Sequence, residues 1–293
     1  MKIQTMSVVV GTTACNASCK FCVSSQTPKH DLPTTPNWRN FINALMLADK
    51  AGATTILLTG KGEPTLYPNL ITEYLKKIMY SKFQFPFIEL QTNGITIGNK
   101  ELEGENEDQD FSFNYLKDWY NLGLTTVCLS AVETGYANRD IYSKEYPEIE
   151  KTAAILNGIG FTVRLSLMMM KQYICRPSDI DRVTDFCKKN KIKQLTLRPI
   201  AYPKNSNNDV SKWTSEHTLT NRELEDIKEH IETFGTPVLH LAHGATVYDF
   251  RGQNLCLANC LTTNDTDDNM RQIIYYPDGT ISFDWKYSGA VLL

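Results

Sequence analysis

The chain has 293 residues, of which 42% are hydrophobic and 22% are charged, and its 30 Lys and Arg residues against 33 Asp and Glu residues give a net charge of −3. This length suits one large domain or two small ones, with a core that needs no disulfides. The small acidic excess argues against a nucleic-acid-binding protein, which usually carries a basic surplus, and it provides no polybasic signal for a membrane surface.

Neither the start of the chain nor its most apolar segment predicts a membrane protein. The longest nearly unbroken apolar stretch, residues 163–170, is interrupted by Arg164 and Ser166. It is far shorter than the roughly 18 residues that a membrane span needs. Residues 1–5 show no apolar run ahead of a small-residue cleavage site, as a secretory signal would. We therefore expect a cytoplasmic protein, in which eight cysteines indicate metal binding rather than disulfides.

Short β-rich runs alternate with amphipathic helical segments along the first 200 residues. The expected strands cover residues 6–10, 54–58, 87–91, 125–129, 161–168 and 194–198. Between them, apolar residues recur at three- and four-residue spacing, as in Phe41, Leu45 and Ala48. Strand starts roughly 30 to 45 residues apart are typical of βαβ units and a parallel sheet. Capping-box patterns, Ser178 with Asp181 and Thr220 with Glu223, predict two helix starts.

Six such units followed by a different tail predict an α/β fold. We expect a partial (β/α)6 TIM-like barrel with a small C-terminal β-containing extension that closes its open side. In this prediction residues 1–200 form the barrel core, residues 201–235 add a loop and a helix that complete it, and residues 236–293 form a β-rich cap. A Pro-Asp-Gly turn predicts a hairpin in the cap between residues 273–276 and 281–285.

Two polar segments are expected to be loops. Residues 99–110 hold six acids and one Lys, and residues 203–217 are rich in Asn and Ser. Aromatic residues of the expected hairpin are predicted to form the packing face of a lid over the barrel mouth; these are Tyr275, Tyr276, Phe283, Trp285 and Tyr287.

The pattern that indicates chemistry most strongly is C-x3-C-x2-C, formed by Cys15, Cys19 and Cys22 after the first expected strand. Thiolates bind soft metals, and this close spacing lets one loop surround a single centre. A four-iron cluster normally takes four Cys, so three ligands leave one iron open, and an open position is where a metal site does chemistry. Zinc remains an alternative if a fourth ligand is near, and His30, eight residues beyond Cys22, is the candidate.

A second pattern, Gly-Lys-Gly-Glu-Pro at residues 60–64, follows the second expected strand. Glycines let the backbone approach a ligand closely, and Glu63 can accept hydrogen bonds from an ammonium group. Taken alone, a Gly-rich turn with an acid is more often a plain connection than a binding loop.

Together the two patterns, with the aromatic Phe21 before the last Cys, resemble the radical S-adenosylmethionine (SAM) superfamily over about residues 3–200. The resemblance implies that Cys15, Cys19 and Cys22 bind a [4Fe–4S] cluster whose fourth iron is chelated by SAM. One electron then cleaves SAM to a 5′-deoxyadenosyl radical, which abstracts hydrogen from the substrate. The commoner motif is Gly-Gly-Glu-Pro, so Lys61 marks a subgroup.

The resemblance also implies which residues of the cysteine loop and the next two turns bind SAM. It places Phe21 beside the adenine. It assigns Gly60, Gly62 and Glu63 to the methionine amino group. Asn93 belongs to a Thr-Asn-Gly turn that the superfamily often has after the third strand.

Three later strands carry further residues that the resemblance links to the cofactor. Ser130 matches the position at the end of the fourth strand that contacts the SAM ribose. On the fifth strand Arg164, Ser166 and Met168 alternate onto one face, and a polar face on a buried strand must find partners. Ser166 resembles the position that contacts the SAM carboxylate or ribose, and Arg164 and Arg198 could anchor SAM or an anionic substrate group. Turn-capping serines and ion-paired arginines are the structural alternatives.

The remaining cysteines and histidines carry weaker patterns. Cys256 and Cys260 in the tail are expected to be two structural thiols or a cysteine pair near the substrate rather than ligands of an auxiliary cluster. Such a cluster needs about four ligands, and Cys175 is the best-placed helper. His240 and His243 lack a third partner and are not predicted to bind metal.

The resemblance implies an enzyme in which the protein binds, orients and excludes water, so no catalytic acid or base is assigned. We expect a small-molecule, nucleotide or peptide substrate and an electron donor such as flavodoxin or ferredoxin. An activase that installs a glycyl radical on a partner enzyme and a non-catalytic zinc-binding interaction module are the alternatives. No pattern indicates the substrate, the oligomeric state or whether SAM is consumed.

Overall fold

The computed structural model describes residues 2–30, 32–99, 111–202, 208–241, 244–258 and 269–293. The strands in these residues are β1 (Lys2–Val9), β2 (Thr55–Thr59), β3 (Phe87–Thr92), β4 (Thr126–Ala131), β5 (Thr162–Met169), β6 (Gln194–Pro199), β7 (Gly235–His240), β8 (Thr246–Phe250), β9 (Gln253–Leu257), β10 (Asn269–Tyr275) and β11 (Ile281–Ser282). They form one sheet in the order β11-β10-β1-β2-β3-β4-β5-β6-β9-β8-β7. The strands from β10 to β9 run parallel, whereas β11, β8 and β7 are antiparallel to their neighbours.

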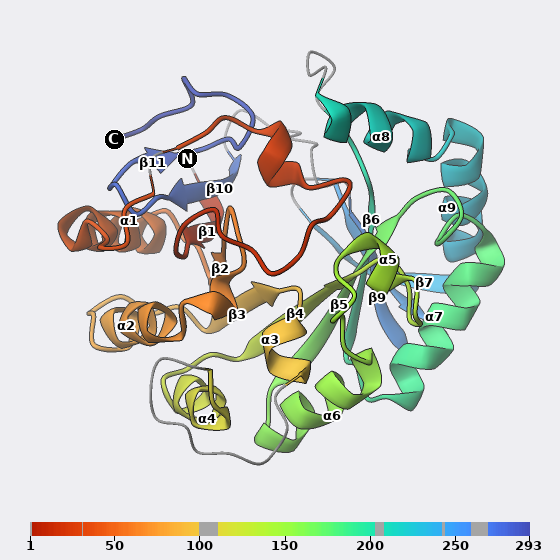
Figure 1. Cartoon of the computed structure of the whole chain (residues 1–293), viewed down its shortest axis with the longest axis horizontal. Helices are drawn as coiled ribbons and strands as arrows, with labels where there is room; N and C mark the ends of the chain where they lie inside the picture. Colours follow the sequence, from red (N-terminus) through yellow and green to blue (C-terminus); the bar gives the residue numbers. More distant parts are fainter. Residues whose placement is uncertain (1, 31, 100–110, 203–207, 242–243, 259–268) are drawn as a thin grey trace.

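Helices cover the outer face of this curved sheet (Figure 1). They are α1 (Trp38–Lys50), α2 (Pro68–Met79), α3 (Ile95–Gly98), α4 (Phe113–Asn121), α5 (Asn138–Ile141), α6 (Ile149–Ile159), α7 (Pro177–Lys189), α8 (Asp209–His217) and α9 (Asn221–Phe234), with the 3-10 turns η1 (Val23–Gln26) and η2 (Pro64–Leu66). None of the described helices is long and apolar enough to cross a membrane.

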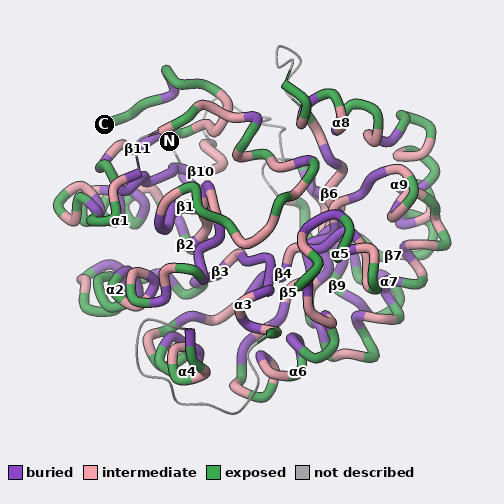
Figure 2. Tube along the Cα trace, in the orientation of Figure 1, coloured by how far each residue is buried: buried purple, intermediate pink, exposed green. Residues whose placement is uncertain are grey.

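The hydrophobic core lies between the sheet and the outer helices. On β5, Val163, Leu165 and Leu167 are fully buried toward the helices, while Arg164 and Ser166 face the interior of the partial barrel. Figure 2 shows that buried residues follow the strands and the inner sides of the helices. Because side chains alternate along each strand, the same sheet supplies an apolar outer face and a polar inner one.

The predicted partial barrel is confirmed, and each of the six expected strands is present. The first strand begins at Lys2, four residues earlier than expected. The hairpin of the tail is also confirmed, although β11 has only two residues. The tail does not close the described sheet, because β10 pairs with β1 at one edge and β9 pairs with β6 at the other, which leaves β11 and β7 as its ends.

Part of the segment expected to be a loop after β6 is a helix. Residues 203–207 lie outside the described residues, but α8 occupies the rest of that segment. The Asn208 side chain accepts a hydrogen bond from the Ser211 amide (2.8 Å), which caps the helix. The helix buries Ser211 and Thr214 rather than an apolar stripe, so hydrophobic periodicity gave no signal. The acidic loop at residues 100–110 also lies outside the described residues.

The structure also tests the two predicted capping boxes and the predicted packing face of the hairpin aromatics. The capping box at Thr220 and Glu223 is confirmed, whereas the one at Ser178 is wrong because α7 begins at Pro177 and Asp179 caps it. The hairpin aromatics do not share one face. Tyr275 packs against Phe41 and Tyr74 on the helical side, while Tyr276 faces the other way, toward His30 and Trp285.

Candidate functional site

The three cysteines of the C-x3-C-x2-C motif lie on one loop directly after β1. Cys15 is exposed and Cys19 and Cys22 are half-buried. The Cys22 amide donates to the Cys19 carbonyl oxygen (3.1 Å), and the Ala17 amide donates to the Cys15 Sγ (3.4 Å). Short local bonds of this kind turn the backbone around the sulfurs, so one loop presents all three of them.

The three sulfurs influence one another electrostatically. Burial raises the pKa values of Cys15 and Cys19; the negative charges of Glu63 and Cys22 add to both rises, and that of Cys15 adds to the rise at Cys19. Neighbouring thiolates need a cation between them to ionise together. Among the described residues no three His, Cys, Asp or Glu side chains are arranged to hold a single ion. A cluster makes a different demand, since each cysteine binds a different iron, and three thiolates on one loop fit that donor set.

The Gly-Lys-Gly-Glu-Pro turn after β2 packs directly on the cysteine loop. The Glu63 amide donates to the Ala14 carbonyl oxygen (2.9 Å), and a Cβ on Gly62 would overlap that carbonyl. Beyond the turn, the Tyr67 ring lies against Gly11, and its hydroxyl is 2.5 Å from the Thr12 Oγ1. The two motifs therefore form one packed unit, and only glycine fits at position 62 without displacing the cysteine loop.

The Glu63 carboxylate is buried and accepts four hydrogen bonds from the protein. Its Oε1 accepts hydrogen bonds from the Thr65 amide (3.0 Å), the Thr65 hydroxyl (2.7 Å) and the Thr92 hydroxyl (2.6 Å). Its Oε2 accepts one from the Asn93 amide (2.9 Å). Burial raises the pKa of this carboxyl, and the four donors oppose that rise. Glu63 thus ties the turn after β2 to the turn after β3.

The Glu63 Oε2 accepts a single hydrogen bond, so the carboxylate keeps one acceptor position. No described donor hydrogen-bonds to the carbonyl oxygens of Gly60 and Gly62. An ammonium group at this turn would find these acceptors free.

Asn93 connects the turn after β3 to the cysteine loop. Its side-chain amide donates to the Asn16 Oδ1 (2.7 Å) and lies 4.0 Å from the Cys15 Sγ, while its own Oδ1 accepts from the Ile95 amide (2.9 Å). Gly94 adopts a left-handed conformation (φ 77°) that lets α3 start there. Turns after three neighbouring strands therefore converge on Cys15.

Ser130 and Ser166 stand side by side on β4 and β5, as register partners that face the interior. Ser166 is 2% exposed, and its hydroxyl has no hydrogen-bond partner among the described residues. A buried hydroxyl without a partner is costly, and a bound polar ligand would relieve that cost. This orphaned group fits the polar end of SAM at the position that the sequence predicts.

Phe21 is buried between two other aromatic residues. Its ring meets Tyr142 edge-on (5.8 Å between centroids) and lies 6.5 Å from Trp213 of α8. The Tyr142 carbonyl oxygen also accepts a hydrogen bond from the Ser18 amide (2.8 Å), which fastens the cysteine loop to the end of α5. Phe21 therefore stands in an aromatic wall beside the cysteines.

Lys61, noted in the sequence only as a departure from the commoner motif, is a buried cation at the edge of the site. Its ammonium donates to the Thr27 hydroxyl (2.6 Å) and to the Pro28 carbonyl oxygen (3.2 Å), and it lies 5.7 Å from the ring centroid of Trp285. Burial lowers the pKa of Lys61 to about 8. The segment after Cys22, the turn after β2 and the C-terminal segment thus meet at this side chain.

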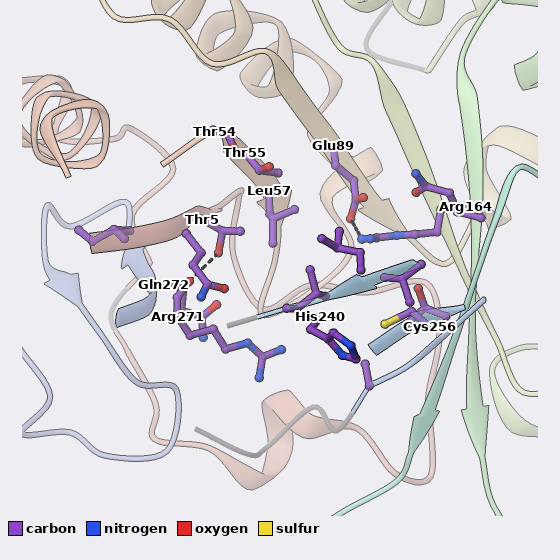
Figure 3. A pocket seen from close by; sticks show the side chains of 18 of the residues that line it. Thr5, Thr54, Thr55, Leu57, Glu89, Arg164, His240, Cys256, Arg271 and Gln272 are labelled. Carbon is purple, nitrogen blue, oxygen red and sulfur yellow. Dashed lines mark hydrogen bonds and ion pairs between the residues drawn. The ribbon is translucent and has the colours of Figure 1, made fainter. Parts of the chain in front are cut away.

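The interior of the partial barrel, on the face that carries the two serines, holds a cavity of about 1110 Å³ (Figure 3). Arg164 and Arg198 both line it. Arg164 forms an ion pair with Glu89, and the Gln91 side chain donates to the same Glu89 oxygen (3.1 Å). Sequence reasoning missed Glu89, although its inward position on β3, two residues from Gln91, is visible in the alternation.

The weaker metal-ligand patterns do not assemble in the described residues. Cys256 lines the cavity, whereas Cys260 and His243 lie outside the described residues. His240 is 3.1 Å from the Thr246 hydroxyl, and His30 stacks on the Tyr276 ring (3.9 Å between centroids).

Comparisons with known proteins agree with this geometry. The family model described as the radical SAM superfamily matches residues 9–173, more than half of the chain. No curated protein matches the sequence. Among solved structures, SuiB from Streptococcus suis bound to S-adenosylmethionine has a TM-score of 0.56 at 16% identity, over 95% of this chain and 60% of SuiB. SuiB bound to precursor peptide SuiA has a TM-score of 0.58 at 16% identity, over 96% of this chain and 59% of SuiB.

A third structure shares the fold across a similar span. A radical SAM methyltransferase from Sphaerobacter thermophilus has a TM-score of 0.54 at 11% identity, over 88% of this chain and 67% of the methyltransferase. The chain spans about 60% of SuiB, so the fold alone carries over from these structures. With the family match and the converging turns together, the chain belongs to the radical SAM superfamily, whose enzymes use a [4Fe–4S] cluster and S-adenosylmethionine.

Proposed function

We propose that this protein cleaves SAM reductively at a [4Fe–4S] cluster held by Cys15, Cys19 and Cys22, and that it uses the resulting radical on a small-molecule or peptide substrate bound inside the barrel. The observation that carries the proposal is the convergence of three turns on Cys15, tied together by Glu63 and Asn93. When bound, the cluster and SAM supply a 5′-deoxyadenosyl radical that takes a hydrogen atom from the substrate.

The residues of this chain hold and orient the cofactor in the proposal. The free carbonyl oxygens of Gly60 and Gly62 accept hydrogen bonds from the amino group of SAM. Ser166, with its unpartnered hydroxyl, and Ser130 beside it bind the ribose or carboxylate. Phe21 and its aromatic neighbours contact the adenine and keep water away from the cysteines. Arg164, two residues before Ser166 on β5, and Arg198, two residues beyond the register partner of Ser166 on β6, face the substrate in the cavity.

The substrate and the electron donor complete the proposal. The cavity of about 1110 Å³ has room for a small molecule or a peptide segment. SuiB, which shares the fold, binds a precursor peptide. An external reductant such as flavodoxin or ferredoxin is needed because the chemistry consumes one electron per cleavage.

Anaerobic reconstitution tests the proposal directly. The purified chain should bind four irons and four sulfides and form 5′-deoxyadenosine from SAM with dithionite. Alanine at Cys15, Cys19 or Cys22 should abolish both iron–sulfur loading and 5′-deoxyadenosine formation. Cys175 is a half-buried cysteine outside the motif, so the Cys175→Ser variant should retain both properties. One zinc without sulfide would instead support the interaction module, and full iron loading without any 5′-deoxyadenosine would contradict the proposed chemistry.

A further inference from the structure

The cavity inside the partial barrel borders the level of the two serines. Thr196 lines it and is the register partner of Ser166 on the neighbouring strand, and Cys256 is in turn the partner of Thr196. Its walls come from both halves of the sheet, since β1, β2 and β10 face β6, β9 and β7 across it. A molecule in this space lies against the inner face of the strands that carry the serines.

The wall of this cavity carries an excess of positive charge. Among the described residues that line it, the only acid is Glu89, and its carboxylate is already paired with Arg164. The lining cations are Lys2, Lys50, Arg164, Arg198 and Arg271. A net positive interior is unusual in a chain whose total charge is −3, so it indicates what the cavity accepts rather than the character of the whole protein.

Arg198 has an unsatisfied hydrogen-bond donor in this cavity. Its Nε is buried and has no hydrogen-bond partner, and no described acidic side chain forms an ion pair with it. A guanidinium presents its donors in a planar fork that matches carboxylate and phosphate oxygens. Burying such a group without an anion is unfavourable, so a purely structural function for Arg198 leaves its cost unexplained.

Three guanidinium groups surround one point of the cavity. Burial raises the pKa of the Cys256 thiol, and the positive charges of Arg198, Arg164 and Arg271 oppose this rise, in decreasing order. In Figure 3 the side chains of Arg164, Arg271 and Cys256 project into the same space from β5, β10 and β9, with His240 of β7 opposite. An anion beside Cys256 would therefore meet cationic groups from several strands.

We propose that the cavity contains an anion subsite, centred on Arg198 beside Cys256, that binds a carboxylate or phosphate group of the substrate. This inference rests on the proposed function in one respect, namely that the bound molecule is the substrate of the radical. The subsite holds the anionic end of the substrate against the inner face of β6 and β9, beside the strand that carries Ser166. An anion is favoured over neutral and cationic molecules of the same size because only an anion neutralises the guanidinium.

The test is calorimetric titration of the reconstituted full chain with three probes at constant ionic strength. Inorganic phosphate and glutarate represent the two anion classes, and glutaramide is the neutral match of glutarate. Each titration is run with and without saturating SAM. A probe that binds in the SAM site is recognised because its binding is lost when SAM is present. We expect saturable binding of phosphate or glutarate in both conditions and none of glutaramide, and the anion that binds identifies the class.

Variants locate the binding. Arg198→Gln should lower the affinity for the anion at least about tenfold, because a charge-assisted hydrogen bond is lost. Arg198→Lys should lower the affinity less. Arg271→Gln serves as a second variant if Arg198→Gln fails to fold. Arg222→Gln, an exposed arginine on α9 outside the cavity, should change nothing.

The subsite is overturned if neither anion binds, if glutaramide binds as tightly as glutarate, or if Arg222→Gln weakens binding as much as the cavity variants do. 5′-Deoxyadenosine formation is measured on the same wild-type preparation. Anion binding without 5′-deoxyadenosine contradicts the proposed function but not the subsite, and the reverse result contradicts the subsite alone.

Discussion

Replacing Glu63 by Gln should destabilise the protein markedly although the change is nearly isosteric. The Glu63 Oε1 accepts three hydrogen bonds and Oε2 accepts one, so the amide oxygen of Gln will take the crowded position. Its NH2 group then faces the Asn93 amide, and two buried donors are left without acceptors.

The expected magnitude follows from those two donors. A buried unsatisfied donor costs about 1–3 kcal/mol, and the weakening of the three remaining bonds is roughly offset by the easier burial of a neutral group. The free energy of unfolding should fall by about 2–4 kcal/mol, which for a chain of this size lowers the Tm by about 2 °C per kcal/mol.

Thermal unfolding of the anaerobic apoprotein measures the effect. Glu229→Gln, an exposed glutamate on α9, is the matched control and should stay within about 0.5 kcal/mol of the wild type. A Tm of the Glu63 variant equal to that of the control would show that the carboxylate does not hold the turns together. The reasoning about convergence on Cys15 would then fail.

Three further changes probe the site at other points. Lys61→Met should shift the midpoint potential of the cluster to more negative values, since it removes a buried positive charge near Cys22, and Lys61→Arg should not; an EPR-monitored redox titration with identical potentials would refute this. Ser166→Ala should leave the apoprotein as stable as the wild type because the hydroxyl has no partner, yet weaken SAM in equilibrium dialysis by about tenfold; unchanged affinity would remove Ser166 from the cofactor site. Gly62→Ala should lower iron loading because its Cβ overlaps the Ala14 carbonyl, whereas Gly158→Ala, in open space on α6, should raise stability by about 0.5–1 kcal/mol; equal iron content in the two variants would contradict the packing argument.

Local sequence patterns were sufficient for the strands and for the location of the motifs. The core strands can be recognised in the sequence because buried parallel strands are short runs of apolar residues between turns, as at residues 54–58 and 87–91. The helix α8 was missed because it packs through Ser211, Thr214 and the half-buried Trp213 instead of an apolar stripe, and its cap at Asn208 carries no periodic signal. Periodicity reports burial of apolar groups, and α8 buries few.

The spacing of residues along the chain could not predict the contacts between distant turns. Glu63 was expected to receive an ammonium group, and spacing gave no sign that its carboxylate also binds Thr92 and Asn93, some thirty residues on. Lys61 was noted only as a deviation, and its partners Thr27 and Trp285 come from opposite ends of the chain. A motif specifies which residues gather after a strand, whereas the neighbouring strand decides which atom of each remains available.

The bonds made by Glu63 and Asn93 all fall within the first hundred residues, whereas the described cavity wall is shared between β1, β2 and β3 and the strands after position 160. The ties around the cysteine loop are therefore encoded in one stretch of the polypeptide, while the surface that would select the target is encoded in two. Mutagenesis restricted to cavity residues of the later strands would vary that surface while the bonds of Glu63 and Asn93 stay unchanged, which gives directed evolution of new specificities a place to start.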